Sequence, residues 1–300
     1  AMGVMSGMMS SSQGLLAGYR RSEESAADET AVRLLTATGH DLSGFADIMR
    51  KLQKQEDLYT ADSAELWRTH PMVKERLALI LAQPSKRADA KRAAAENDVF
   101  FRMKAKLDGF LSSPQKIKAE YKDDSLPSHY ARAVFAYRTG DFANAEKQID
   151  ALIAAEPENP YFYELKGQLL FETARGAEAV APYEKAVELL PDSDLFRIGL
   201  AQALLSDENQ TDTDRALAVL SPVKADLPLL WRLKATAYGR AGKTGLAAYA
   251  LAEYNSAAGD SRQTEYFAKK AINALPANDS AALKARDILA GLKENRASAR

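Results

Sequence analysis

The sequence contains no cysteine, which excludes a disulfide framework, a thiol nucleophile and any metal site built on cysteine. Long apolar runs are also lacking. None approaches the roughly 18 residues of a membrane-spanning helix, and the Met-rich start, Met2 to Met9, lacks the basic and apolar regions of a signal peptide. We expect this start to follow further sequence upstream. The 40 basic and 41 acidic residues nearly balance, so no global field favours nucleic acid as a partner.

What the sequence does contain is a repeat with a period of 34 residues. Four anchor residues recur in register in two consecutive units: Ala133, Ala145, Leu152 and Pro157, then Gly167, Ala179, Ala186 and Pro191. A third unit starts near Leu195 with an expanded polar turn, and a fourth starts near Trp231. This period is typical of tetratricopeptide units, which are helix-turn-helix pairs that stack into an α-solenoid. A generic helical bundle in which small residues recur by chance is the alternative.

Two further amphipathic helices are expected to close the stack. They cover about 261–274 and 280–293, and Pro276 marks the boundary between them because proline does not fit inside a helix. We therefore predict a solenoid of tetratricopeptide repeats over 127–295.

The N-terminal third is predicted to be helical but shows no such period. Apolar spacing favours helices over 23–37 and 42–58, a third after Pro71 and a long one over 88–111. The chain is thus expected to be all-α, with 46% apolar residues supplying the cores. Its predicted parts are an N-terminal domain portion over 1–85, connecting helices over 86–126 and the repeats.

An acidic pair and a distant histidine are the candidates for chemistry in the N-terminal part. Glu24 and Asp28 are four residues apart, which puts both carboxylates on one helical face. Further along, Thr69-His70-Pro71 is followed by Arg76. The plain interpretation is a solvated acidic edge at a helix N-terminus and a capping histidine beside Pro71.

Taken together, these motifs and the repeats resemble the gluzincin metallopeptidases of the CAAX-protease and HtpX-like type. Within this group the chain is most similar to the BepA-like periplasmic proteases, which carry a tetratricopeptide tail. The resemblance implies a helical C-terminal remnant of a zinc metallopeptidase domain, followed by repeats that bind protein or peptide substrates. It also implies a periplasmic setting in envelope protein quality control, with the outer-membrane assembly machinery as a possible partner.

The resemblance assigns a role to each candidate residue. Glu24 corresponds to the third zinc ligand, and Asp28 to a carboxylate that steadies the ligands from outside. His70 corresponds to a histidine that approaches the zinc or the substrate oxyanion, and Arg76 to the basic residue beside it. These roles are expectations from the family.

The chain departs from the family at a decisive place, because none of its histidines, His40, His70 and His129, lies in a His-Glu-x-x-His motif. Without two imidazoles and a general-base glutamate, we expect this chain alone to bind Zn²⁺ weakly or not at all and to be inactive. A non-enzymatic tetratricopeptide adaptor is the alternative. His40 is expected in a helix-ending turn and His129 at the first repeat, neither on a metal.

The repeats suggest a second activity, since the first helix of each tetratricopeptide unit lines a concave surface. Counting from the anchors places eight residues near this groove: Tyr130, Tyr137, Glu164, Gln168, Gln202, Arg232, Thr236 and Arg240. Aromatic and arginine side chains supply much of the binding energy of protein interfaces, so these residues are candidates for contacting a protein or peptide. Ordinary solvated surface is the alternative for each of them.

Overall fold

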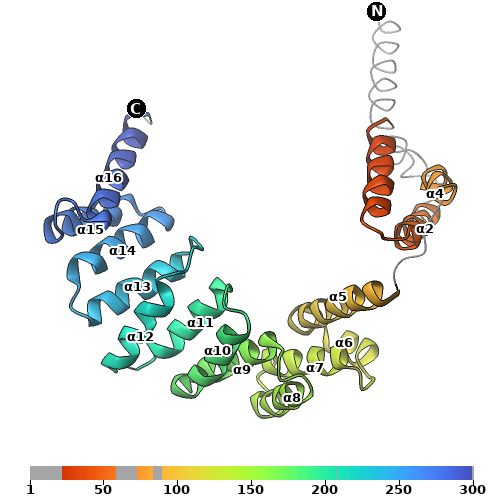
Figure 1. Ribbon diagram of the computed structural model, residues 1–300, viewed down its shortest axis with the longest axis horizontal. Coiled ribbons are helices and arrows are strands. Elements are labelled where there is room, and N and C mark those ends of the chain that lie inside the picture. The colour runs from red at the N-terminus through yellow and green to blue at the C-terminus, as the bar shows by residue number, and fades with distance from the viewer. Residues whose placement is uncertain (1–21, 59–72, 84–89, 208, 299–300) are drawn as a thin grey trace, which may run out of the picture. The chain divides into compact units, whose positions relative to one another are not determined.

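The computed structural model describes residues 22–58, 73–83, 90–207 and 209–298, and every regular element in these ranges is an α-helix (Figure 1). The predicted all-α class is therefore confirmed. The residues group into two compact units, 1–101 and 102–300, each of which is described by itself. No helix in the described ranges is long and apolar enough to cross a membrane. The predicted boundary between residues 85 and 86 lies outside them.

The first unit contains a helix over 22–37, α2 (Ser43–Leu58) and α4 (Val73–Leu81). Its core consists of five apolar residues that are almost fully buried: Leu42, Ala46, Met49, Val73 and Ile80. The first helix ends at Ala37, close to the predicted bound, and Gly39 in the following turn adopts a left-handed φ of 77°. The following His40 N–H donates to Leu35 O at 2.9 Å, which is a common way of closing a helix C-terminus.

The second unit includes the end of α5 (Ala90–Leu111) and the helices that follow it. These are α6 (Pro114–Glu120), α7 (Leu126–Arg138), α8 (Phe142–Ala155), α9 (Pro160–Glu172), α10 (Gly176–Leu189), α11 (Asp194–Leu204), α12 (Gln210–Leu220), α13 (Pro228–Arg240), α14 (Thr244–Ala257), α15 (Ser261–Ala274) and α16 (Ser280–Ser298). From α7 onward each helix packs against the next, and α11 packs against both α9 and α13. The predicted α-solenoid is confirmed, and Figure 1 shows the helices following one another along it.

Local sequence signals explain where many of these helices begin. The Ser113 hydroxyl accepts a hydrogen bond from the backbone N–H of Lys116, and Pro114 occupies the first turn. Asn159 and Pro160 repeat the same arrangement at the start of α9. Proline fits at this position because its missing N–H would have no partner inside the helix.

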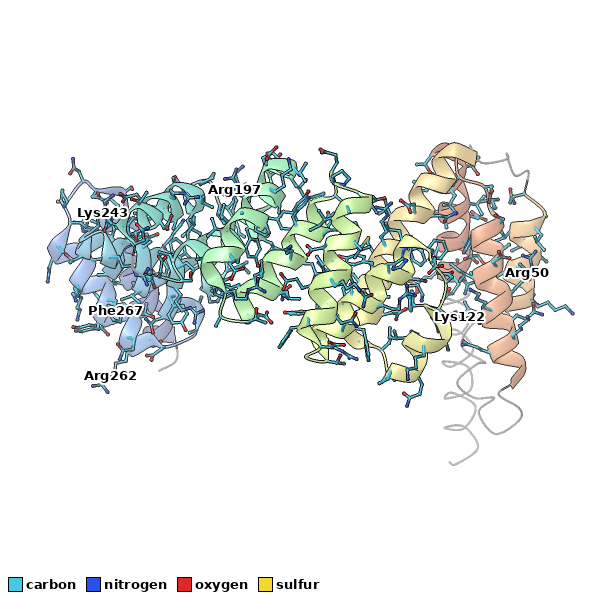
Figure 2. The ribbon with its side chains drawn as sticks, turned by 90° about the horizontal axis from the view of Figure 1, so that it is seen from below. Arg50, Lys122, Arg197, Lys243, Arg262 and Phe267 are labelled. Carbon is cyan, nitrogen blue, oxygen red and sulfur yellow. The ribbon has the colours of Figure 1, made fainter. Side chains whose placement is uncertain are left out.

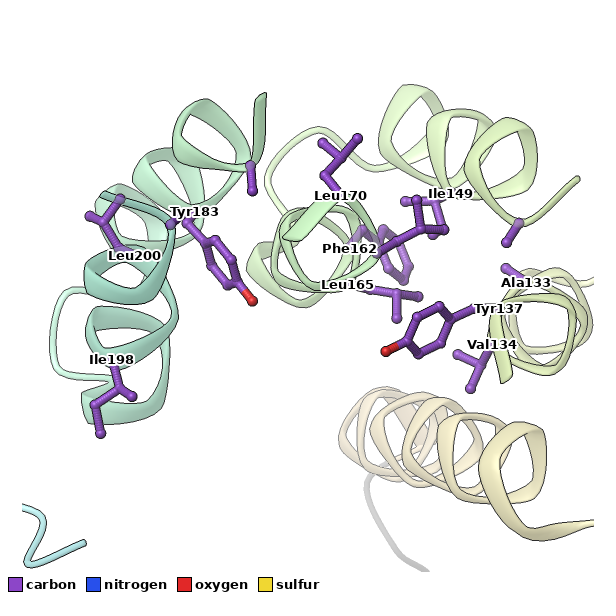
Figure 3. Packing of buried hydrophobic residues seen from close by; sticks show 14 of the residues in the cluster. Ala133, Val134, Tyr137, Ile149, Phe162, Leu165, Leu170, Tyr183, Ile198 and Leu200 are labelled. Carbon is purple, nitrogen blue, oxygen red and sulfur yellow. The ribbon is translucent and has the colours of Figure 1, made fainter. Parts of the chain in front are cut away.

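The small anchor residues of the repeat are buried where helices meet. Ala133 and Ala145 have no exposed surface. The ring of Tyr183, shown in Figure 3, fills the space beside two helical glycines. A Cβ on Gly167 would lie 2.7 Å from Tyr183 Cδ2, and one on Gly199 would lie 2.5 Å from Tyr183 Cε1. The units therefore pack tightly because glycine leaves room for the aromatic ring.

Candidate functional site

The two predicted carboxylates and the predicted arginine lie together in the first unit. Glu24 and Asp28 are one turn apart on the helix over 22–37, and Arg76 on α4 reaches both of them. Arg76 Nε donates to Asp28 Oδ2 at 2.7 Å, and Arg76 Nη2 donates to Asp28 Oδ1 at 2.8 Å. Arg76 Nη1 lies 2.9 Å from Glu24 Oε2. One guanidinium thus engages both carboxylates.

This cluster is shielded from water. The side chains of Asp28, Arg76 and Glu24 are 9%, 16% and 28% exposed. The hydrogen bonds to Asp28 raise the pKa of Arg76 above its ordinary value, against the opposing effect of burial. A planar guanidinium that meets a carboxylate with two parallel hydrogen bonds is a strong and directional contact. The pairing therefore fixes the first helix on α4 and sets the orientation of both carboxylates.

A groove of about 500 Å³ opens beside the cluster, between the first helix and α4. It is lined by Ser25, Asp28, Glu29, Val32, Arg33, Thr36, Ala37, Leu79, Ile80 and Gln83. Asp28 belongs both to the ion-pair cluster and to the wall of this groove. The site predicted from the sequence is consequently next to a surface depression that a polypeptide segment could enter.

The structure describes two of the three histidines for which the sequence made predictions. His70 lies outside the described residues, so its predicted role stays a prediction. His40 lies in the turn after the first helix, where its Nδ1 is 2.9 Å from the Thr38 hydroxyl. His129 is on α7, with its Nδ1 3.1 Å from Arg132 Nη2.

The described residues do not form a complete metal centre by themselves. Within those ranges, no three His, Cys, Asp or Glu side chains come together in a group that could hold a metal ion. Zinc in a catalytic site takes three protein ligands and leaves a fourth position for water. Glu24 fits one carboxylate ligand of such a site, because its oxygen is half-buried and held in place by Arg76. Its role as a zinc ligand stays a prediction.

The structure corrects the prediction for two of the groove residues. Tyr130 and Tyr137 are 3% and 7% exposed, so neither can present a surface to a partner. Tyr130 packs edge-on against Phe162, and Tyr137 packs edge-on against Phe110 of α5; Figure 3 labels Tyr137 and Phe162. The prediction was wrong for Tyr137 because Phe110 of α5 packs against its ring, and for Tyr130 because its ring is buried against Phe162 of α9.

The same segment of α5 also contacts α9, the first helix of the second tetratricopeptide repeat. Lys106 Nζ lies 2.8 Å from Glu164 Oε2, which takes the predicted groove residue Glu164 into an internal ion pair. Arg102 pairs with Glu156 at the end of α8. Sequence reasoning missed this contact, although Ala105 and Gly109 give α5 a small-residue face, and a Cβ on Gly109 would lie 2.7 Å from Val134 Cβ.

The remaining groove candidates keep varying amounts of exposed surface. Gln168 is half-buried and donates to Glu172 Oε1 at 3.1 Å, and Gln202 is half-buried as well. Arg232 and Thr236 are exposed on α13. Arg240 donates to the backbone oxygen of Asp207, which links α13 to the turn after α11. Contact of these residues with a partner stays a prediction.

Comparison with known proteins defines the class. Residues 1–83 match the model of Peptidase family M48, and residues 130–194 match that of a tetratricopeptide repeat. The chain therefore joins a segment of M48 peptidase sequence to tetratricopeptide repeats, and the resemblance found in the sequence is confirmed.

Two curated relatives narrow the class further. The beta-barrel assembly-enhancing protease of Yersinia pestis is 22% identical over 210 residues, and that of Escherichia coli (strain K12) is 23% identical over 215 residues. The alignments cover 67% and 68% of this chain and 43% of each relative. The chain is thus homologous to these proteases at low identity and spans less than half of their length.

Proposed function

We propose that residues 1–85 complete the catalytic domain of a zinc metalloendopeptidase, and that the repeats present protein substrates or partners to it. By analogy with the named relatives, the setting is the periplasm and the task is quality control in outer-membrane protein assembly. The two histidines and the general-base glutamate would come from sequence outside these 300 residues, since no His-Glu-x-x-His is present among them.

The observation that carries this proposal is the arrangement of Glu24, Asp28 and Arg76. In a zinc site of this kind, Glu24 would supply one carboxylate ligand, and the metal would polarise the scissile carbonyl and activate water. Arg76 holds Glu24 through one ion pair and Asp28 through two hydrogen bonds, so it orients both carboxylates. A ligand that is held by outer partners loses little freedom when it binds, which favours metal affinity and geometry.

The test uses the full-length protein with Glu24→Gln, compared with Glu23→Gln on the same helix. Glu23 is exposed, so its exchange alters charge equally without touching the cluster. We expect Glu24→Gln to lower zinc content and to abolish proteolysis of an unfolded outer-membrane protein, while Glu23→Gln leaves both unchanged. Wild-type zinc content and proteolysis in Glu24→Gln would reject the proposal.

The behaviour of the 300-residue chain alone follows from the same proposal. It should bind Zn²⁺ weakly and should not cleave protein, because it supplies at most one of the expected catalytic ligands. Tight stoichiometric binding of Zn²⁺ in calorimetry would overturn this expectation. An adaptor without enzymatic activity is the second candidate, favoured by the solenoid core that extends from Ala105 to Ala237 within the second unit.

A further inference from the structure

Part of the solenoid's concave face is occupied by the chain's own α5. Its residues 102–111 contact α7 through Phe110 and Tyr137 and α9 through Lys106 and Glu164. A partner that binds the first helices of the tetratricopeptide repeats therefore finds α7 and α9 partly covered, while in the part of the chain that the structure describes α5 does not cover α11, α13 or α15.

The solenoid divides sharply in charge at the start of α13. Residues 102–227 carry 15 Lys and Arg against 21 Asp and Glu, whereas residues 228–300 carry 12 Lys and Arg against 6 Asp and Glu. The near-zero charge of the whole chain conceals this division. The last units thus carry a local positive field that attracts negative groups.

Within the described residues, most positive charges of the last units also lack a nearby carboxylate. Before α13, ion pairs tie neighbouring helices together: Arg102 with Glu156, Lys106 with Glu164, Arg175 with Glu146, and Arg215 with Glu184. Among the Lys and Arg residues whose side chains are described between 228 and 294, only Lys269 has a carboxylate within 4.0 Å, namely Glu265 one turn earlier. Cations without such partners are available to a ligand, and Lys269 stays accessible in its pair because its side chain is 62% exposed.

Several of these cations share exposed helix faces with groups that suit polypeptide recognition. On α13, Arg232 is exposed next to Thr236. On α15, a shallow pocket of about 480 Å³ is lined by Tyr266, Lys269, Lys270, Asn273 and Ala274. Tyr266 is 59% exposed, and Arg262 at the start of α15 extends away from the repeats in Figure 2.

We propose that the exposed faces of α13 and α15 bind an acidic segment of a partner polypeptide, with Arg232, Lys269 and Lys270 contacting its carboxylates. This proposal rests on the proposed role of the repeats as a protein-binding domain and names the chemistry of the partner. Tyr266 and Asn273 supply an aromatic surface and amide hydrogen bonds, which are suited to side chains and backbone of a peptide.

The charge division also favours a short acidic segment over an extended polyanion. Nucleic acid that follows the solenoid would meet the excess of acidic residues over 102–227, which repels phosphate. A segment that spans only the faces of α13 and α15 meets the positive part alone. A second copy of the chain, offering its acidic units, remains an outcome that the test separates.

The test measures binding of a fluorescently labelled Glu/Asp-rich peptide to the 300-residue chain at low salt. A second peptide, with Gln and Asn in place of every Glu and Asp, reports binding that is independent of charge. We expect the acidic peptide to bind at least about tenfold more tightly than its neutral counterpart and to be released at roughly 0.3 M salt. The triple variant R232Q/K269Q/K270Q should lose at least about tenfold in affinity.

The matched control variant removes three exposed lysines outside the proposed surface, Lys122, Lys147 and Lys224, by exchange to Gln. It lowers the net charge equally and should bind the acidic peptide as the wild type does. Equal binding of the two peptides, or equal loss in both triple variants, would overturn the proposal. Tighter binding of DNA or of anionic vesicles than of the acidic peptide would assign the surface to another ligand, and peptide-independent dimers in ultracentrifugation would assign it to a second copy.

The outcome is separable from that of the proposed protease function. The R232Q/K269Q/K270Q exchanges leave Glu24 and its neighbours untouched, so zinc content and cleavage chemistry of the full-length protein should not change. Loss of zinc in Glu24→Gln with normal peptide binding supports the protease alone, whereas failure of the acidic peptide to bind rejects only the surface proposed here.

Discussion

Arg76 and Asp28, 48 residues apart in the sequence, are joined by two hydrogen bonds of 2.7 and 2.8 Å. The contact connects the first helix to α4 at the place where Glu24 is also held. It gives the M48 segment a defined structure around the residue that is proposed to bind metal.

Replacement of Arg76 by Ala should destabilise the first unit by about 2–4 kcal/mol, because Asp28 would be left buried without its cationic partner. Hydrogen exchange of backbone amides over 22–58 measures this loss locally. The control is Arg50→Ala, whose exposed pair with Asp47 should contribute no more than about 0.5 kcal/mol. Similar losses in both variants would contradict a special role for the Arg76 contact.

Gly199→Ala should destabilise the solenoid by about 1–3 kcal/mol, since the new methyl group would collide with the Tyr183 ring. Gly239 on α13 serves as the comparison, because no heavy atom lies within 4 Å of a Cβ placed there. Gly239→Ala should stabilise the protein by up to about 1 kcal/mol through helix propensity. Urea denaturation followed by circular dichroism measures both changes, and the same sign for both would refute the packing argument.

The turn residue Ala174 should prefer glycine. It has a φ of 59°, and Gly140, which occupies the equivalent turn 34 residues earlier, has a φ of 83°. Ala174 is exposed, so Ala174→Gly relieves backbone strain without loss of packing and should stabilise the protein by about 0.5–1 kcal/mol. Gly140→Ala should destabilise it by a similar amount. A lower thermal midpoint in Ala174→Gly would show that the turn is unstrained.

Acid should weaken the junction of α5 and α6 through Asp108. This carboxylate accepts hydrogen bonds from Lys104 at 2.6 Å, Lys116 at 2.8 Å and Tyr121 at 2.6 Å. Partial burial disfavours the anion, but the hydrogen bonds outweigh burial and hold the pKa of Asp108 well below its usual range. Ionised Asp108 therefore stabilises the fold above the unfolded pKa of about 3.9, and this contribution disappears as the pH falls through the folded pKa.

The corresponding experiment follows the urea midpoint from roughly pH 6 down to pH 2. Asp108→Asn should be less stable than the wild type at neutral pH and should lose less on acidification. Asp150→Asn is the control, because Asp150 is 51% exposed in its pair with Lys166. An acid limb that is unchanged by Asp108→Asn would rule out this carboxylate as its cause.

The candidate site could be predicted only in part. Spacing alone put Glu24 and Asp28 on one helical face, because residues four apart on a helix are neighbours. The two hydrogen bonds from Arg76 to Asp28 could not be predicted in this way, because they depend on how α4 packs against the first helix. His70 lies outside the described residues, so its role remains a prediction.

The repeat was readable because each unit needs small residues at fixed positions for its helices to approach, and Ala133, Gly167 and Ala179 occur at those positions. The sequence by itself therefore determined the all-α class, the solenoid and its 34-residue register. Only the tertiary structure decided which concave residues are accessible. Tyr130 and Tyr137 have the right register, yet the first is buried against Phe162 of α9 and the second against Phe110 of α5, and contacts between distant segments leave no periodic mark in the sequence.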